Sequence, residues 1–166
     1  MASLEFIGLV FTGLSISISL IYYASVLKNS NTTRKTQLYM QLFQTITSEE
    51  FMKRSIDLLD WKFKDYEEFR EKYLEDSSLS AKWFSMTWWI DGLGFLMSEG
   101  LLDPDMVYNF GSGGSAQIRH WMKYEPVISE MRKSRENPEF LKWFEYLCEE
   151  MKTLRSERGL NPNPNP

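Results

Sequence analysis

The hydrophobic pattern begins with an apolar run at residues 6–27 that contains no charged residue. A helix rises about 1.5 Å per residue, so a helix of this length matches the hydrocarbon core of a bilayer. A cleaved signal peptide fits less well, because no Lys or Arg precedes the run and the run is too long for such a peptide. A buried core helix is seldom this long without charges. The pattern therefore predicts a membrane anchor.

The charges beside this run predict its orientation. Only Glu5 precedes it, whereas Lys28, Arg34 and Lys35 follow it closely. Positively charged flanks stay on the cytoplasmic side of a spanning helix. We therefore expect a single-pass protein of the cell membrane, with its N-terminus outside, its C-terminal domain in the cytoplasm and the lipid bilayer as its first partner.

Small side chains recur on one face of the predicted anchor, at steps of four, three and four residues: Gly8, Thr12, Ser15 and Ser19. Such a stripe lets two helix backbones approach closely in a membrane. It predicts contact with a second copy, giving a homo-oligomer, or with a larger membrane protein complex. Because Gly, Ser and Thr are common in spanning helices, a stripe without a contact role stays open as well.

After the anchor, apolar residues follow helical spacing and no alternating strand pattern occurs. Helix caps are expected at Thr32 or Thr33, at Thr47 with Glu50 as a capping box, and at Asp103-Pro104 and Asn137-Pro138. Further helices are expected near 65–74, 81–99 and 115–134, the last bent near Pro126. The expected fold is all-α, an N-terminal transmembrane helix followed by a compact multi-helix cytoplasmic bundle. Its divisions are an anchor at 1–28, a helical domain at 29–159 and a disordered tail at 160–166.

The charge balance excludes one class of partner. The chain has 19 Lys plus Arg and 23 Asp plus Glu, and Glu5 is the only charged residue before Lys28. Nucleic-acid binding needs a basic stripe that neutralises phosphates, so no nucleic-acid partner is expected.

Asp91 is the first candidate for chemistry, because it shares a helical stripe with the aromatic residues Phe84, Trp88 and Phe95. A carboxylate buried there needs a partner or a raised pKa. The candidate partners in later helices are Arg119, His120 and Arg132. Two interpretations stay open, a proton-handling or ligand-binding acid and a structural acid that ties helices together.

The remaining motifs argue against other chemistries. His120 is the only histidine, which excludes sites built from several histidines, and we expect no metal and no cofactor. Cys148 lies in an aromatic helical segment, where a small buried hydrophobe is the ordinary interpretation, and a single thiol suits a reducing compartment. The glycine-rich residues 111–115 lack the Lys-Ser or Lys-Thr of a nucleotide loop, so they indicate a helix connector.

A set of short motifs at residues 33–151 carries a family resemblance. They are Thr33-Arg34-Lys35-Thr36-Gln37-Leu38, Trp61 with Asp65-Tyr66-Glu67-Glu68-Phe69, Asp91-Gly92-Leu93-Gly94, Gly100-Leu101-Leu102-Asp103, Trp121 with Pro126-Val127-Ile128, and Phe144-Glu145-Tyr146-Leu147. The chain resembles an uncharacterised prokaryotic family of helical proteins, many with an N-terminal membrane segment, classed only as a domain of unknown function. The resemblance implies a helical shape and supplies no catalytic residue.

These observations predict a membrane-tethered interaction or scaffold module, or an accessory subunit of a membrane-associated assembly, without catalysis of its own. Exposed Trp and Tyr rings are expected to supply a docking patch, although most rings should fill the core. The alternative is a small-ligand sensor or an enzyme with a pocket formed by Asp91, Arg119 and His120. Whether the chain is an enzyme stays open.

Overall fold

The computed structural model of the chain describes residues 2–110 and 112–164, with side chains from residue 18 onward, and helices connected by short segments make up these parts. Seven α-helices and one π-helical segment form there, with no strand, so the all-α prediction is confirmed. The helices are α1 (Ala2–Ile46), α2 (Glu49–Asp60), α3 (Tyr66–Phe69), η1 (Arg70–Leu74), α4 (Ser77–Ser98), α5 (Pro104–Tyr108), α6 (Ser115–Ser134) and α7 (Lys142–Glu157). The chain divides into two compact units, Met1–Met40 and Gln41–Pro166.

The helix α1 corrects the predicted membrane anchor. Within the described residues, no helix combines the length and the apolar character needed to cross a membrane. The transmembrane helix of the predicted fold class and the predicted location in the cell membrane, with its single-pass topology, are therefore wrong.

The predicted contact stripe falls mostly on residues that the structure does not describe in full. Gly8, Thr12 and Ser15 lie outside the described side chains, and Ser19 is described within α1. The contact of this stripe with a second helix therefore stays a prediction without a structural test.

The predicted helix start at Thr32 or Thr33 is wrong, because both residues lie inside α1. The Thr32 hydroxyl donates to the carbonyl oxygen of Lys28 and the Thr33 hydroxyl to that of Asn29, each at 3.0 Å. A threonine hydroxyl that bonds to its own helix one turn back does not cap a new helix.

Local caps place most helices of the second unit close to their predicted positions. The Ser48 hydroxyl accepts a hydrogen bond from the Phe51 amide at 3.3 Å, one residue after the predicted cap at Thr47. Asp103 caps α5 ahead of Pro104, as predicted. The helix α6 has the predicted bounds and contains Pro126.

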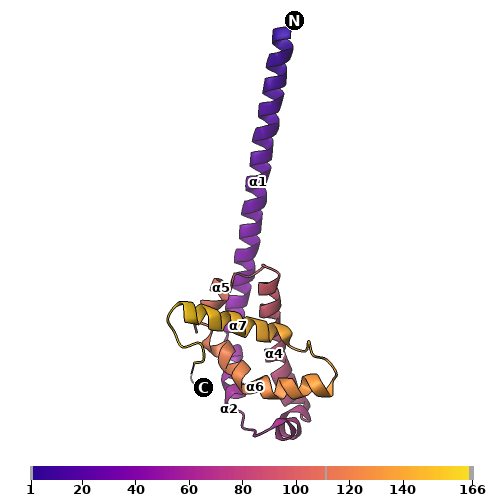
Figure 1. Cartoon of the computed structure of the whole chain (residues 1–166), viewed down its shortest axis with the longest axis vertical. Helices are drawn as coiled ribbons and strands as arrows, with labels where there is room; N and C mark the ends of the chain where they lie inside the picture. The colour runs from indigo at the N-terminus through magenta and orange to yellow at the C-terminus, as the bar shows by residue number, and fades with distance from the viewer. Residues whose placement is uncertain (1, 111, 165–166) are drawn as a thin grey trace. The chain divides into compact units, whose positions relative to one another are not determined.

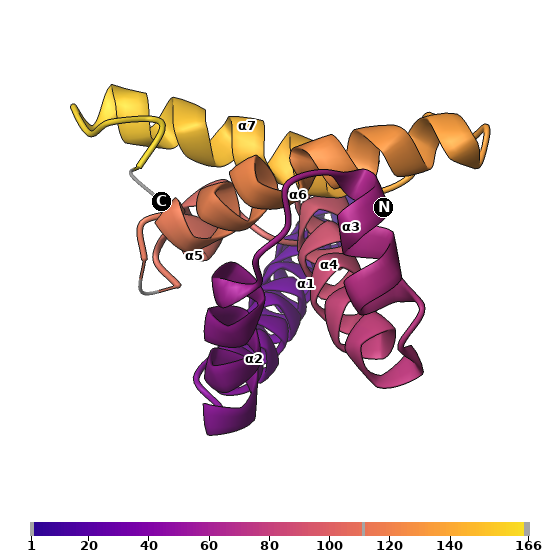
Figure 2. The same ribbon diagram turned by 90° about the horizontal axis from the view of Figure 1, so that it is seen from below.

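An aromatic cluster forms the core of the second unit where α3, α4 and α6 meet. Phe69, Trp83 and Tyr124 are fully buried, with ring centroids 5.4 to 5.8 Å apart. The Tyr124 hydroxyl donates to the carbonyl oxygen of Leu58 at 2.6 Å, which satisfies its polar end inside the core. Figure 2 shows α3, α4 and α6 gathered around this region, with α2 to one side.

The helix α7 crosses α4 closely, as Figure 1 shows. Gly94 makes this possible, because a Cβ atom there would lie 1.9 Å from the carbonyl oxygen of Trp143. The predicted start of this last helix at Asn137-Pro138 is wrong, since α7 begins at Lys142 after Leu141, which has a φ of 55°. The helix that packs on Gly94 is therefore aligned by contacts other than a local cap.

Candidate functional site

Asp91 supplies the missing cap of α7. It lies three residues before Gly94 on α4, and its Oδ1 accepts a hydrogen bond from the Phe144 amide at 2.9 Å. A carboxylate at a helix N-terminus satisfies a free amide and interacts favourably with the helix dipole. The acid thus does for α7, from another helix, what an N-cap residue does within its own helix.

The surroundings of Asp91 perturb its protonation in opposite directions. Burial raises the pKa of the carboxyl group, while the amides of Phe144 and Trp143 and the charge of Arg132 lower it, and the net shift is upward. Arg132 itself donates to the carbonyl oxygen of Phe140 at 2.8 Å and pairs with Glu145 at 2.8 Å. Structurally, Asp91 therefore belongs to a junction between α4, α6 and the start of α7.

Arg119 and His120 line a different feature, a half-open cavity of about 500 Å³ between α2, α4 and α6. Its walls are mainly apolar, with Phe51, Met86 and Trp89 among them. Asp91 is not among the residues that line this cavity. The structure thus brings together two of the three residues predicted for a ligand pocket and places the third at a helix junction.

His120 is held inside this cavity wall as a neutral ring. It is 3% exposed, and its Nε2 lies 2.9 Å from the Ser55 hydroxyl. Burial lowers the pKa of His120 to about 4, and the charges of Lys123 and Arg119 act in the same direction. A ring that stays neutral near neutral pH can form a hydrogen bond with Ser55 without placing a charge in the wall of the cavity.

An aromatic row runs along the outer face of α4 onto α7. We use this name for Phe84, Trp88, Phe95 and Trp143. Trp88 and Phe95 are 59% and 44% exposed, whereas Trp83, Ile90 and Leu93 on other faces of α4 are buried. The predicted stripe through Asp91 is thus a surface feature with one half-buried acid, and the core face of α4 lies elsewhere on the helix.

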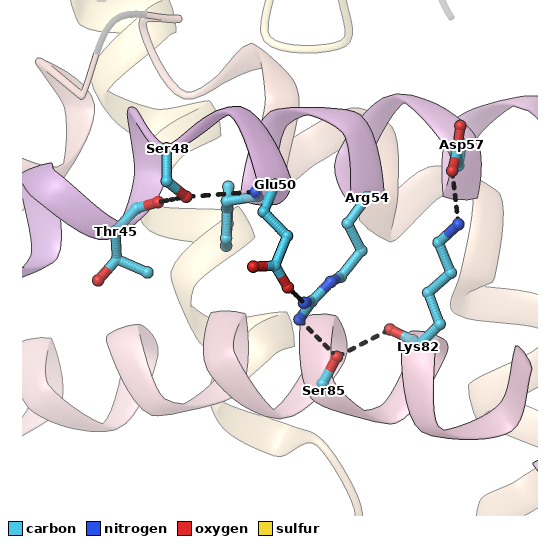
Figure 3. Close-up of polar contacts among 8 residues, drawn as sticks. Thr45, Ser48, Glu50, Arg54, Asp57, Lys82 and Ser85 are labelled. Atoms are coloured by element: carbon cyan, nitrogen blue, oxygen red, sulfur yellow. Dashed lines mark hydrogen bonds and ion pairs between the residues drawn. The ribbon is translucent and has the colours of Figure 1, made fainter. Parts of the chain in front are cut away.

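Charged and hydroxyl side chains line a second surface hollow between α2 and α4, and two ion pairs form within it. Figure 3 shows Arg54 between Glu50 and Ser85, at 2.6 and 2.9 Å, and the Lys82 ammonium beside Asp57 at 2.5 Å. Paired surface charges of this kind contribute little to stability, and here Arg54–Ser85 and Asp57–Lys82 connect α2 to α4. This hollow serves as a junction between α2 and α4.

The structure also shows the surroundings of Cys148 and of the glycine-rich connector. Burial raises the pKa of the Cys148 thiol well above its usual range, so the thiol stays protonated and unreactive. Gly113 and Gly114 of the predicted connector have positive φ angles, and Arg155 donates to the Gly113 carbonyl oxygen at 2.9 Å. Within the described residues, no group of three His, Cys, Asp or Glu side chains could hold a metal ion.

Sequence reasoning missed the contribution of α2 to the cavity. Ser55 and Ile56 follow Met52 on it after about one turn, and Met52 and Ile56 are about half exposed. Their helical spacing was visible in the sequence, but a stripe of this kind usually faces a closed core.

Comparison with known proteins gives one match. A family model described as a domain of unknown function, DUF4760, matches residues 4–151. No curated protein and no solved structure matches the chain.

Proposed function

The chain belongs to this family, the domain of unknown function DUF4760, and we propose that it acts as a helical interaction module without catalysis of its own. The aromatic row carries this proposal, because Trp88 and Phe95 are large side chains left 59% and 44% exposed in one line. Exposed aromatic side chains that cluster on one face are typical of protein interaction surfaces.

The row is preorganised by ring contacts and by the helix crossing beneath it. The rings of Phe84 and Trp88 have centroids 5.1 Å apart, and those of Phe95 and Trp143 lie 5.9 Å apart. Asp91, between the two pairs, ties α7 to α4 through the Phe144 amide. Side chains held in this way lose little freedom on binding, which favours affinity.

The charges beside the row indicate the chemistry of the partner. The Arg135 guanidinium lies 5.7 Å from the Phe84 ring centroid and the Lys142 ammonium 4.9 Å from that of Trp143. Lys142 pairs with Glu139, whereas no ion pair among the described residues includes Arg135. The surface suits a partner protein that presents apolar side chains flanked by acidic groups.

The role of Asp91 supports an interaction function over a catalytic one. Its Oδ1 accepts a hydrogen bond from the backbone of α7 and so aligns two helices, a structural role that needs no proton transfer. The prokaryotic origin implied by the sequence resemblance is part of the proposal and rests on that resemblance alone.

Site-specific photocrosslinking of the full chain in its native cells tests the proposal. A photoreactive phenylalanine analogue replaces Phe95 in one variant and Met122 in a control, since Met122 is a 42% exposed apolar residue on α6. We expect one protein of defined mass to crosslink at position 95 and not at 122, and Trp88→Gln to reduce that product strongly.

Two outcomes contradict the proposal. Equal crosslinking at positions 95 and 122 means that the aromatic row is not a specific surface. A product with twice the mass of the chain means that the row joins two copies, so the partner is not a different protein.

A further inference from the structure

The cavity between α2, α4 and α6 lies on another side of α4 from the aromatic row. Met86, Trp89 and Ile90 of α4 line it, whereas Trp88 and Phe95 belong to the row. Its volume of about 500 Å³ lies in the range of pockets that hold small molecules. It can therefore serve a ligand independently of any protein bound to the row.

One charged group faces this mainly apolar cavity. Among the described lining residues, Arg119 alone carries a charge near neutral pH, because His120 is neutral and bonded to Ser55. The Arg119 Nε is buried and has no hydrogen-bond partner within the described part of the chain. No ion pair between described residues includes Arg119. The wall of the cavity thus includes a cation without an ion-pair partner among the described residues.

We propose that this cavity binds a small apolar carboxylic acid, with the carboxylate on Arg119 and the hydrocarbon body between α2, α4 and α6. A carboxylate matches the fork of a guanidinium and supplies the negative charge that no ion pair among the described residues gives Arg119. Phe51, Met86 and Trp89 suit a hydrocarbon body. One arginine in apolar walls fits a single negative charge better than a phosphate, which needs more donors.

Because three helices surround the cavity, ligand binding is expected to stabilise the folded chain. Phe51 and Met52 belong to α2, Met86 and Trp89 to α4, and Arg119 to α6. A ligand that contacts all three helices binds only the folded chain, so it raises the unfolding temperature, and the rise continues to grow as the ligand concentration exceeds the dissociation constant. Methionine side chains adapt to different shapes, so acids of related size should bind with similar affinity.

Isothermal titration calorimetry of the full chain with octanoate, decanoate and decanol tests the proposal, together with the unfolding temperature. We expect both acids to bind and to raise that temperature, and decanol, which lacks the charge, to bind more weakly. Arg119→Gln should weaken decanoate binding about tenfold to hundredfold, the usual effect of losing a charge-assisted hydrogen bond. Arg70→Gln, which changes a surface cation outside the cavity, should leave it unchanged.

A second variant tests the volume of the cavity. Ala116 lines it from the first turn of α6, and Ala116→Leu retains a helix-favouring residue while filling the space. We expect Ala116→Leu to fold and to lose binding of both acids. The proposal is overturned if neither acid binds the unchanged protein, if decanol binds as tightly as decanoate, or if Arg119→Gln and Arg70→Gln have equal effects. None of these results bears on the aromatic row.

Discussion

The substitution Gly94→Ala tests the helix crossing that aligns the aromatic row. A Cβ atom at position 94 would lie 1.9 Å from the carbonyl oxygen of Trp143 and 2.6 Å from its carbonyl carbon. Ordinary contact begins near 3.4 Å, so α7 must retreat by about 1.5 Å. These neighbours are backbone atoms, so no side-chain rotation can relieve the clash. The movement also stretches the bond between the Phe144 amide and Asp91.

The expected loss follows from these two effects. Overpacking costs about 1 to 3 kcal/mol and a lost buried hydrogen bond about 1 to 3 kcal/mol, while replacing glycine in a helix returns about 1 kcal/mol. We therefore expect Gly94→Ala to lower the free energy of unfolding by about 3 kcal/mol, measured by urea denaturation with circular dichroism. Gly92→Ala is the matched control, since a Cβ atom there meets nothing within 4 Å. It should be neutral or stabilising, and equal effects of the two variants would refute the reasoning.

Three further predictions concern stability. Burial lowers the pKa of His120 in the folded chain from 6.5 to about 4, so the unfolded chain takes up this proton first as pH falls from about 7 to about 4. The free energy of unfolding should therefore fall by about 3 kcal/mol over this range. Denaturation of His120→Gln across the same range should show a smaller decrease than that of the unchanged chain. Asp91→Leu should cost about 1 to 3 kcal/mol in urea denaturation and Asp91→Asn less, because the amide oxygen still accepts from α7; equal losses would contradict the capping role. Gly114→Ala should lower the unfolding temperature more than Gly159→Ala. Both glycines have positive φ angles, but only a Cβ atom at position 114 would clash with α7, 2.8 Å from the Cβ atom of Met151. An equal decrease would show that backbone strain alone determines the loss of stability.

Helix boundaries with local causes could be predicted from the sequence. Asp65 and Asp103 cap α3 and α5 with their own side chains. The bounds of α6 follow from the glycines before it and from its apolar spacing. Each of these signals lies within a few residues of the helix end that it controls, so it can be recognised from the amino-acid sequence.

Boundaries with distant causes could not be predicted. The cap of α7 comes from Asp91, 53 residues earlier in the chain, so Asn137-Pro138 gave the wrong start. The threonines at 32 and 33 resemble caps, yet their hydroxyls bond within α1. The membrane anchor was inferred from an uncharged run alone, and the described helices do not support it.

The candidate site was predicted in part. Arg119 and His120 are adjacent in sequence and line the same cavity. The stripe through Asp91 raised the possibility of a buried carboxylate, but α4 is apolar on several faces, and periodicity cannot say which one is covered. The packing of α7 on Gly94 decides this and leaves Trp88 and Phe95 exposed.

The central claim is that the aromatic row holds a partner protein, and the native mass of the complex tests it most directly. The full chain is purified under mild conditions from its own cells and compared with a double variant, Trp88→Gln with Phe95→Gln, and with Met122→Gln as control. We predict a complex of fixed stoichiometry with a different protein for the unchanged chain and the control, and its loss in the double variant, since truncating such anchors typically weakens binding about thirtyfold or more. The same complex in all three samples would contradict the claim.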